Sequence, residues 1–130
     1  MSRMQLRQFR RRGGPTQGGV QTLMLETIGA RSGALRTAML GFIEESEGSW
    51  LVIASLAGAA RHPSWLHNLA SMPDVTIEFA DGRRVPVRAE TLDGQELDAA
   101  WNLIAVEAPE YVKYRSKTDR PIPVLRLRRR

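Results

Sequence analysis

Residues 49–55, SWLVIAS, form an apolar run in which polar residues do not alternate with apolar ones. A strand of this composition is covered on both faces, whereas a strand with one face in water alternates. The chain has 130 residues, the size of one domain with one sizeable core. The run therefore predicts a central strand that other parts of the same domain cover on both sides.

Five further segments have the composition or the alternation of strands. Two of them are joined by Asp-Gly at 81–82, a strong hairpin signal, and their apolar residues are expected to share one face. Six antiparallel strands with short connections are too many for an open sheet over so small a core, so we expect a mainly β (α+β) domain, a closed or split β-barrel of about six antiparallel strands. The expected strands are 20–28, 36–45, 49–55, 74–80, 83–91 and 122–128, and the shared hairpin face is Val75, Ile77, Phe79, Val85, Val87 and Ala89.

Two segments, 63–72 and 93–108, have the apolar spacing of helices. Asp93 and Glu96 have the spacing of a capping box at the start of the second one. With the short segment that Pro109 opens, the barrel is expected to have two or three flanking helices. The expected apolar stripes are Trp65, Leu69 and Met72 in the first helix and Leu97, Ala100, Trp101 and Ile104 in the second.

Basic residues are concentrated at the two ends of the chain. The formal net charge is +5, but residues 1–12 and 120–130 hold five arginines each and no acid. Residues 13–119 keep 9 basic against 14 acidic groups, so the body of the domain is acidic. A nucleic-acid groove needs cations spread over the folded surface with aromatic residues between them. The distribution therefore argues against specific nucleic-acid binding.

Residues 1–18 have too few apolar side chains to fold alone and end in a glycine-rich stretch. We expect a flexible basic arm and linker there, and a single domain over 19–130. A solvated arm is the simpler interpretation, although Met4, Leu6 and Phe9 among its arginines permit a peripheral membrane contact. No apolar run reaches the roughly 18 residues of a membrane span and no secretory signal is visible, so a cytoplasmic location is expected.

The residues present exclude several kinds of catalytic and metal site. The chain has no cysteine, which excludes disulfides, thiolate nucleophiles and cysteine-based metal sites. Its two histidines, His62 and His67, lack metal-binding spacing, so no metal site is expected. A hydrolase triad of Ser55, His62 and Asp74 lacks the supporting GxSxG turn. The loop GARSG has neither the dinucleotide-binding spacing nor that of the Walker loop.

The segment GARSGALR, 29–36, lies between two strand-like segments and carries residues suited to an anion. Its glycines let a ligand approach the backbone, its serine supplies a hydroxyl, and its arginines supply charge that pairs with phosphate or carboxylate. A plain hairpin turn with two solvated arginines is the alternative. The residues concerned are Gly29, Arg31, Ser32, Gly33 and Arg36.

A second stretch of small residues, 54–63, directly follows the apolar run. Exposed backbone N–H groups in such a stretch can lie against a flat ligand, so the two loops together predict a site for a planar ring with an anionic tail. Trp65 could wall this site, although a plain core position is the alternative for it. Tyr111 and Tyr114, three residues apart on one face, are further candidates.

Three segments resemble, in order and in spacing, the deazaflavin (coenzyme F420)-dependent nitroreductase family. They are LMLETIGARSGALRTAML, VIASLAGAARHPSWLHNLASMPDVTIEF and YVKYRSKTDRPIPVL, which extend from about residue 23 to 126. The resemblance implies an FMN-binding split-barrel-like fold, in agreement with the barrel expected from the strands. It also implies that loop 29–36 holds the phosphate and acidic tail of F420, and that stretch 54–63 lines the deazaflavin ring.

The resemblance assigns roles to individual positions. The implied cofactor-binding residues are Arg31, Ser32, Gly33, Arg36, Ser55, Ala57, Gly58, Ala59, Pro63, Trp65 and Asn68. The implied catalytic residues are Ser55, Tyr111 and Tyr114, of which the tyrosines close the substrate side.

At four positions the chain departs from the family pattern. Ala30 and Leu56 stand where cations are common, and Ala59 replaces the second glycine of a pair. These changes imply fewer contacts to the cofactor tail and weaker cofactor binding. Ala108 stands where the nitroreductases carry a tyrosine just before the proline. Quinone reduction makes fewer demands on the protein than nitroreduction and is expected to tolerate the last change.

The function that the resemblance implies is hydride transfer from reduced F420 to an electron-poor acceptor such as a quinone or a nitro compound. A split barrel that uses FMN, and a non-enzymatic carrier of a lipid or cofactor, remain as alternatives. The chain is expected to work as a monomer or a homodimer. Its many Ala, Gly and Arg residues are typical of an actinobacterial protein.

Overall fold

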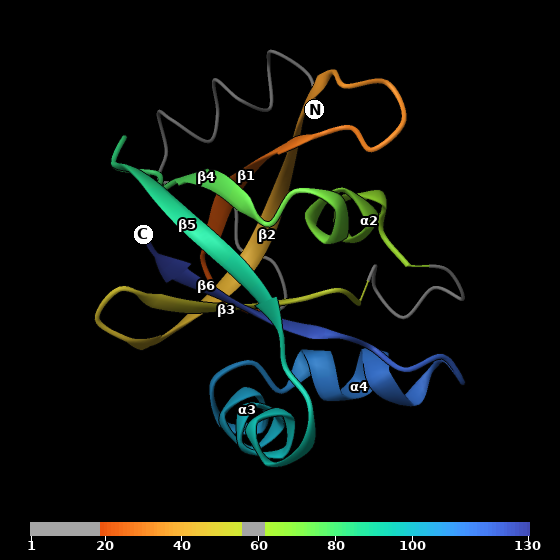
Figure 1. Cartoon of the computed structure of the whole chain (residues 1–130). Helices are drawn as coiled ribbons and strands as arrows, with labels where there is room; N and C mark the ends of the chain where they lie inside the picture. Colours follow the sequence, from red (N-terminus) through yellow and green to blue (C-terminus); the bar gives the residue numbers. More distant parts are fainter. Residues whose placement is uncertain (1–18, 56–61) are drawn as a thin grey trace.

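The computed structural model describes residues 19–55 and 62–130, which contain six strands and three helices. The strands form a closed antiparallel barrel in the order β1-β2-β3-β6-β5-β4 (Figure 1). The barrel and its flanking helices confirm the expected fold class. The elements are β1 (Thr22–Ile28), β2 (Leu35–Ser46), β3 (Ser49–Ile53), α2 (Ser64–Ser71), β4 (Asp74–Glu78), β5 (Arg84–Thr91), α3 (Gly94–Glu107), α4 (Glu110–Ser116) and β6 (Val124–Arg129).

Pairing between strands that are distant in the sequence closes the barrel. β1 and β2, β2 and β3, and β4 and β5 pair as sequence neighbours, whereas β6 lies between β3 and β5. The last seam joins β1 to β4 through the pairs Met24 with Glu78, Leu25 with Ile77 and Glu26 with Thr76. Because every strand then has two partners, the sheet has no open edge.

β3 is buried on both faces, as its apolar run predicts. Trp50 and Val52 point into the barrel interior, where they join the apolar residues of the β4–β5 hairpin. Leu51 and Ile53 point outward into a second cluster, which α3 and α4 cover. The inward alternation predicted for the hairpin is confirmed, because Val75, Ile77, Phe79, Val85 and Val87 belong to the interior cluster and Ala89 packs against it.

α3 and α4 lie together against one side of the barrel, and α2 lies on another side near the tip of the β1–β2 hairpin (Figure 1). α3 and α4 bury Trp101, Ile104 and Tyr111 against the barrel wall. The guanidinium carbon of Arg115 lies 4.4 Å from the centre of the Trp101 ring and covers its outer side. No helix among the described residues is long and apolar enough to cross a membrane.

Two details of the helix predictions are wrong. Met72 does not continue the buried stripe of α2: the helix ends at Ser71, and the Met72 side chain is 47% exposed. Asp93 and Glu96 do not form a capping box, since the N-cap of α3 has no side-chain hydrogen bond. The Glu96 carboxylate instead accepts a hydrogen bond of 2.7 Å from Arg126 on β6, because this cation is a stronger partner than a backbone N–H.

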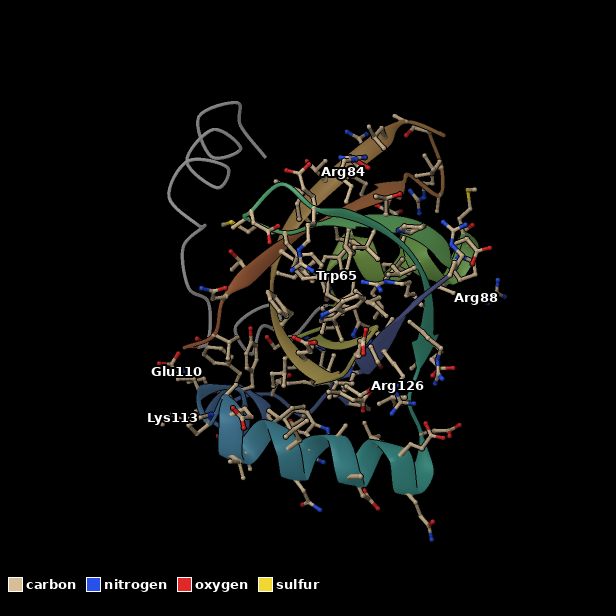
Figure 2. The ribbon with its side chains drawn as sticks, turned by 90° about the vertical axis from the view of Figure 1, so that its left-hand side faces the viewer. Trp65, Arg84, Arg88, Glu110, Lys113 and Arg126 are labelled. Carbon is tan, nitrogen blue, oxygen red and sulfur yellow. The ribbon has the colours of Figure 1, made fainter. Side chains whose placement is uncertain are left out.

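Arg126 ties three other elements together on the side of the barrel that faces α3 (Figure 2). Its side chain is 14% exposed and donates to Glu45 of β2, Glu90 of β5 and Glu96 of α3. The hydrogen bonds from Arg126 hold the pKa of Glu45 below its ordinary value, with burial opposing them and a hydrogen bond from Ser49 adding to them. The cluster therefore stabilises the fold only while its carboxylates are ionised.

Replacing Arg126 by Met keeps most of the side-chain length and removes the charge. We expect the free energy of unfolding at pH 7 to fall by about 2–3 kcal/mol, since carboxylates lose a partly buried partner. Because the pKa of Glu45 is lowered on folding, the stabilisation is present above the unfolded value of about 4.3 and lost as the pH falls through the folded value. The loss measured by urea unfolding should therefore shrink toward pH 3.

Arg88→Met is the matched control, because Arg88 forms an exposed pair with Asp74 on β4. This variant should stay within about 0.5 kcal/mol of the wild type. An equal loss in both variants, or a loss for Arg126→Met that does not change with pH, would contradict the account of the cluster.

Candidate functional site

An open pocket with a volume of about 760 Å³ lies between the tip of the β1–β2 hairpin and the start of α2. It brings together four of the residues predicted from the sequence, Arg31, Ser32 and Arg36 from the hairpin and Asn68 from the helix. Its further lining residues are Gly29, Ala30, Thr37, Ser64 and His67.

The hairpin loop has a tight internal structure that depends on glycine. The N–H of Gly29 donates to the carbonyl oxygen of Ala34 at 2.7 Å, and the N–H of Gly33 donates to that of Gly29 at 2.9 Å. Gly33 has a φ of +70°, which favours glycine. A Cβ on Gly29 would lie 2.8 Å from the Ser32 hydroxyl, which accepts a hydrogen bond from the Ala34 N–H. A side chain at position 29 would therefore displace a pocket-lining hydroxyl.

Asn68 fastens this loop to α2. Its side-chain amide is buried, donates to the Thr27 hydroxyl at 3.1 Å and accepts from the Ala30 N–H at 3.0 Å. Asn68 therefore satisfies two polar groups of the hairpin and fixes the distance between the hairpin and the helix. These two bonds hold the two sides of the pocket together, whereas the cofactor contact implied for Asn68 stays a prediction.

The pocket is cationic. Arg31 and Arg36 are exposed at its surface, and none of the described residues that line it is acidic. The first turn of α2, with Ser64 in the pocket lining, adds backbone N–H groups and the positive end of the helix dipole, and Pro63 before it supplies no side-chain cap. These features suit phosphate or carboxylate groups. Among the described residues, no cluster suited to a metal ion is present.

Ser55 lies two residues after the end of β3 and is 5% exposed. The structure places its carbonyl oxygen 2.7 Å from Nη2 of Arg120, which donates to it. Ala57, Gly58 and Ala59, predicted to line the ring, and Leu56 lie outside the described residues. Sequence reasoning missed Arg120, although it lies within the third family-like segment, because its charge was grouped with the basic C-terminal end.

Tyr111 and Tyr114 share one face of α4, as predicted, with ring centres 5.6 Å apart and an edge-to-face arrangement. Burial raises the pKa of Tyr111 to about 12, and the neighbouring Tyr114 and Glu110 add to the rise. The Tyr111 hydroxyl is therefore protonated at neutral pH and can donate a hydrogen bond but not act as a base. Neither tyrosine lines the cationic pocket, and Ala108 just before α4 is fully buried.

Trp65 points into the barrel interior, where it belongs to the core cluster (Figure 2). Its side chain is 8% exposed, which agrees with the alternative of a plain core position. Pro63 is buried at the N-cap of α2. A contact of either residue with a cofactor stays a prediction, and so do the individual binding and catalytic roles of the other residues.

A closed antiparallel barrel, beside a cationic pocket that no acidic residue lines in the described part of the chain, defines a split-barrel protein with a site suited to an anionic small molecule. The sequence model of the F420H(2)-dependent quinone reductase family matches residues 1–128 of this chain, so the chain belongs to that family. The prediction of an F420-dependent oxidoreductase is thereby confirmed, and so is F420 as the cofactor of its family.

Individual relatives agree with the family assignment. The chain is 36% identical over 116 residues to the F420H(2)-dependent quinone reductase Rv1261c of Mycobacterium tuberculosis, covering 87% of this chain and 76% of the relative. It superposes on the solved structure of the F420-H2 dependent reductase FDR-A with a TM-score of 0.71 and 34% identity, covering 82% and 92% of the two chains. A structure described as a domain-swapped dimer matches with a TM-score of 0.73 and 30% identity, covering 96% and 95%.

The hydrogen bonds of Asn68 predict the behaviour of a single amide. In an Asn68→Ala variant, the Ala30 N–H loses its acceptor, and we expect its hydrogen exchange to become at least tenfold faster when measured by NMR. Ser71→Ala, an exposed change on the same helix, should leave that rate unchanged. Equal protection of Ala30 in Asn68→Ala and the wild type would show that the loop holds its position without Asn68.

Proposed function

We propose that this chain binds F420 through the hairpin pocket and catalyses hydride transfer from its reduced form to a quinone. The observation that supports the pocket assignment is the meeting of Arg31, Ser32 and Arg36 with the first turn of α2 around a space that no acidic residue lines among the described ones. An anionic tail fits this donor set, and the absence of a side chain at Gly29 leaves room for the Ser32 hydroxyl that lines the pocket.

In the proposed complex, Arg31 and Arg36 pair with the acidic groups of the tail, and the Ser32 hydroxyl adds a hydrogen bond. When bound, the reduced deazaflavin supplies the hydride. The protein's contribution is to hold the two rings in reacting geometry and to exclude water. By the family resemblance, Tyr111 and Tyr114 close the acceptor side, and burial, which raises the pKa of Tyr111 to about 12, keeps its hydroxyl protonated.

A quinone is the favoured acceptor. The family is that of the quinone reductases, and Rv1261c carries the same description. Ala108, where nitroreductases carry a tyrosine, is fully buried, so this position offers no polar group to a nitro acceptor. Reduction of nitro compounds stays a prediction, to be tested by supplying a nitro-aromatic compound beside the quinone.

The oligomeric state and the membrane contact of the arm can each be measured. The structural relative described as a domain-swapped dimer supports a homodimer as one proposal for this chain, beside a monomer. Light scattering behind a sizing column measures which of them is present.

Vesicle flotation of the full chain and of a chain without residues 1–18 tests the predicted membrane contact of the arm. Equal flotation of the two would show that the arm makes no membrane contact.

The double variant Arg31→Ala, Arg36→Ala tests the pocket. The wild type should bind oxidised F420 at micromolar concentration by tryptophan quenching, and the variant at least 30-fold more weakly, since two charge-assisted contacts worth about 1–2 kcal/mol each are lost. Arg83→Ala is the control, because Arg83 pairs with Asp81 on the β4–β5 hairpin. Equal affinity of the double variant and the wild type would place the tail elsewhere.

Oxidation of reduced F420 by menadione under anaerobic conditions tests the reaction. We expect turnover by the wild type and none by heat-denatured protein. FMN added in a competition titration should not displace F420; displacement by FMN would favour the flavin alternative. F420 binding without turnover of several quinones and nitro compounds would favour a non-enzymatic carrier.

A further inference from the structure

Arg120 forms hydrogen bonds with two backbone carbonyls and one imidazole that lie more than 50 residues before it in the sequence. It lies between α4 and β6, and its guanidinium donates to the carbonyl oxygen of Ala54 at 3.1 Å through Nη1 and to that of Ser55 at 2.7 Å through Nη2. Nη1 also lies 3.0 Å from Nδ1 of His62. Because a guanidinium only donates, Nδ1 of His62 is the acceptor and the imidazole proton is on Nε2.

These contacts fix the chain where it leaves β3 and where it returns before α2. Carbonyl groups of successive residues in a regular strand point in opposite directions, so two successive carbonyls on one guanidinium mark the end of strand geometry after Ile53. The backbone just after Arg120 holds the same part of the chain, since the carbonyl oxygen of Pro123 accepts from the Ala54 N–H at 2.9 Å. Arg120 thus fastens Ala54, Ser55 and His62 to the strand that follows it.

The hydrogen bonds of Arg120 are more shielded from water than those of a surface arginine. Ala54 and Ser55 are buried, and Arg120 and His62 are partly buried, so water competes poorly for the two carbonyl oxygens. A planar fork of N–H groups can serve all three acceptors at once, whereas the ammonium group of a lysine is a single point. The position therefore calls for arginine in particular.

We propose that Arg120 is a positioning residue for F420, which holds Ser55 and His62 in the arrangement that cofactor binding requires. The inference rests on the proposed function and on the cofactor contact that the family resemblance implies for Ser55. His62 lies two residues before Ser64, which lines the cationic pocket. Arg120 itself acts through Ser55 and His62. Its loss is therefore expected to weaken F420 binding and to leave unaffected the acceptor side, which the resemblance assigns to Tyr111 and Tyr114.

The test compares Arg120→Ala, Arg120→Lys and the control Arg88→Ala, an exposed arginine on β5. F420 affinity is measured by tryptophan quenching, menadione KM at saturating reduced F420, and thermal midpoints by circular dichroism. We expect Arg120→Ala to raise the Kd for F420 at least tenfold with menadione KM within twofold of the wild type. Arg120→Lys should recover only part of the affinity, and Arg88→Ala should match the wild type.

His62→Ala removes one of the contacts and keeps the test decisive if Arg120→Ala does not fold. It should raise the Kd for F420 about threefold or more. A Kd within twofold of the wild type for the folded Arg120 variants, or for His62→Ala where those do not fold, would overturn the positioning role, even if the thermal midpoint fell. A wild type that does not bind F420 would overturn the proposed function, and this inference with it.

Discussion

The pairing of β1 with β4 is the contact on which the rest of the structure depends. It closes the sheet, and Arg84 of β5 spans the seam by donating to Glu26 of β1 and Glu78 of β4 (Figure 2). Two residues separate the end of α2 from the start of β4. Because β4 pairs with β1, α2 lies beside the end of β1, where the hairpin loop starts. This arrangement lets Asn68 donate to the Thr27 hydroxyl and accept from the Ala30 N–H. The closed barrel therefore positions both sides of the site.

Two apolar clusters stabilise the fold, and the polar groups that serve the site lie at their margins. The interior cluster fills the barrel, and the outer cluster attaches α3 and α4, with β3 contributing to both. Polar groups that serve the site lie at the margins of these clusters: Asn68 between α2 and the hairpin, and Arg120 between β3 and β6. Each satisfies backbone groups that strand pairing leaves over. Substitutions at these margins should therefore alter ligand affinity more than the fold.

Local patterns in the sequence were enough to predict the barrel, because alternation in the β4–β5 hairpin and the unbroken run of β3 reflect burial directly. The cationic loop was also predictable, since its residues are adjacent in the chain. The capping box failed because Glu96 has a partner, Arg126, that is 30 residues away. Arg120 was grouped with the basic C-terminal end because its acceptors, Ala54 and Ser55, lie more than 60 residues earlier and nothing local marks them. Long-range partners of charged side chains are set by the closed barrel and leave no local signal.

The most direct test of the account is amide chemical-shift mapping by NMR during titration of the full chain with F420. A second pocket, with Phe42, Trp50 and Phe79 in its lining, lies by the start of β3 and the end of β6. Its amides provide a comparison with those of the cationic pocket in the same titration. The account predicts that the large shifts fall on 29–37 and 64–68, around the cationic pocket. Shifts confined to the residues around Phe42, Trp50 and Phe79 would contradict it.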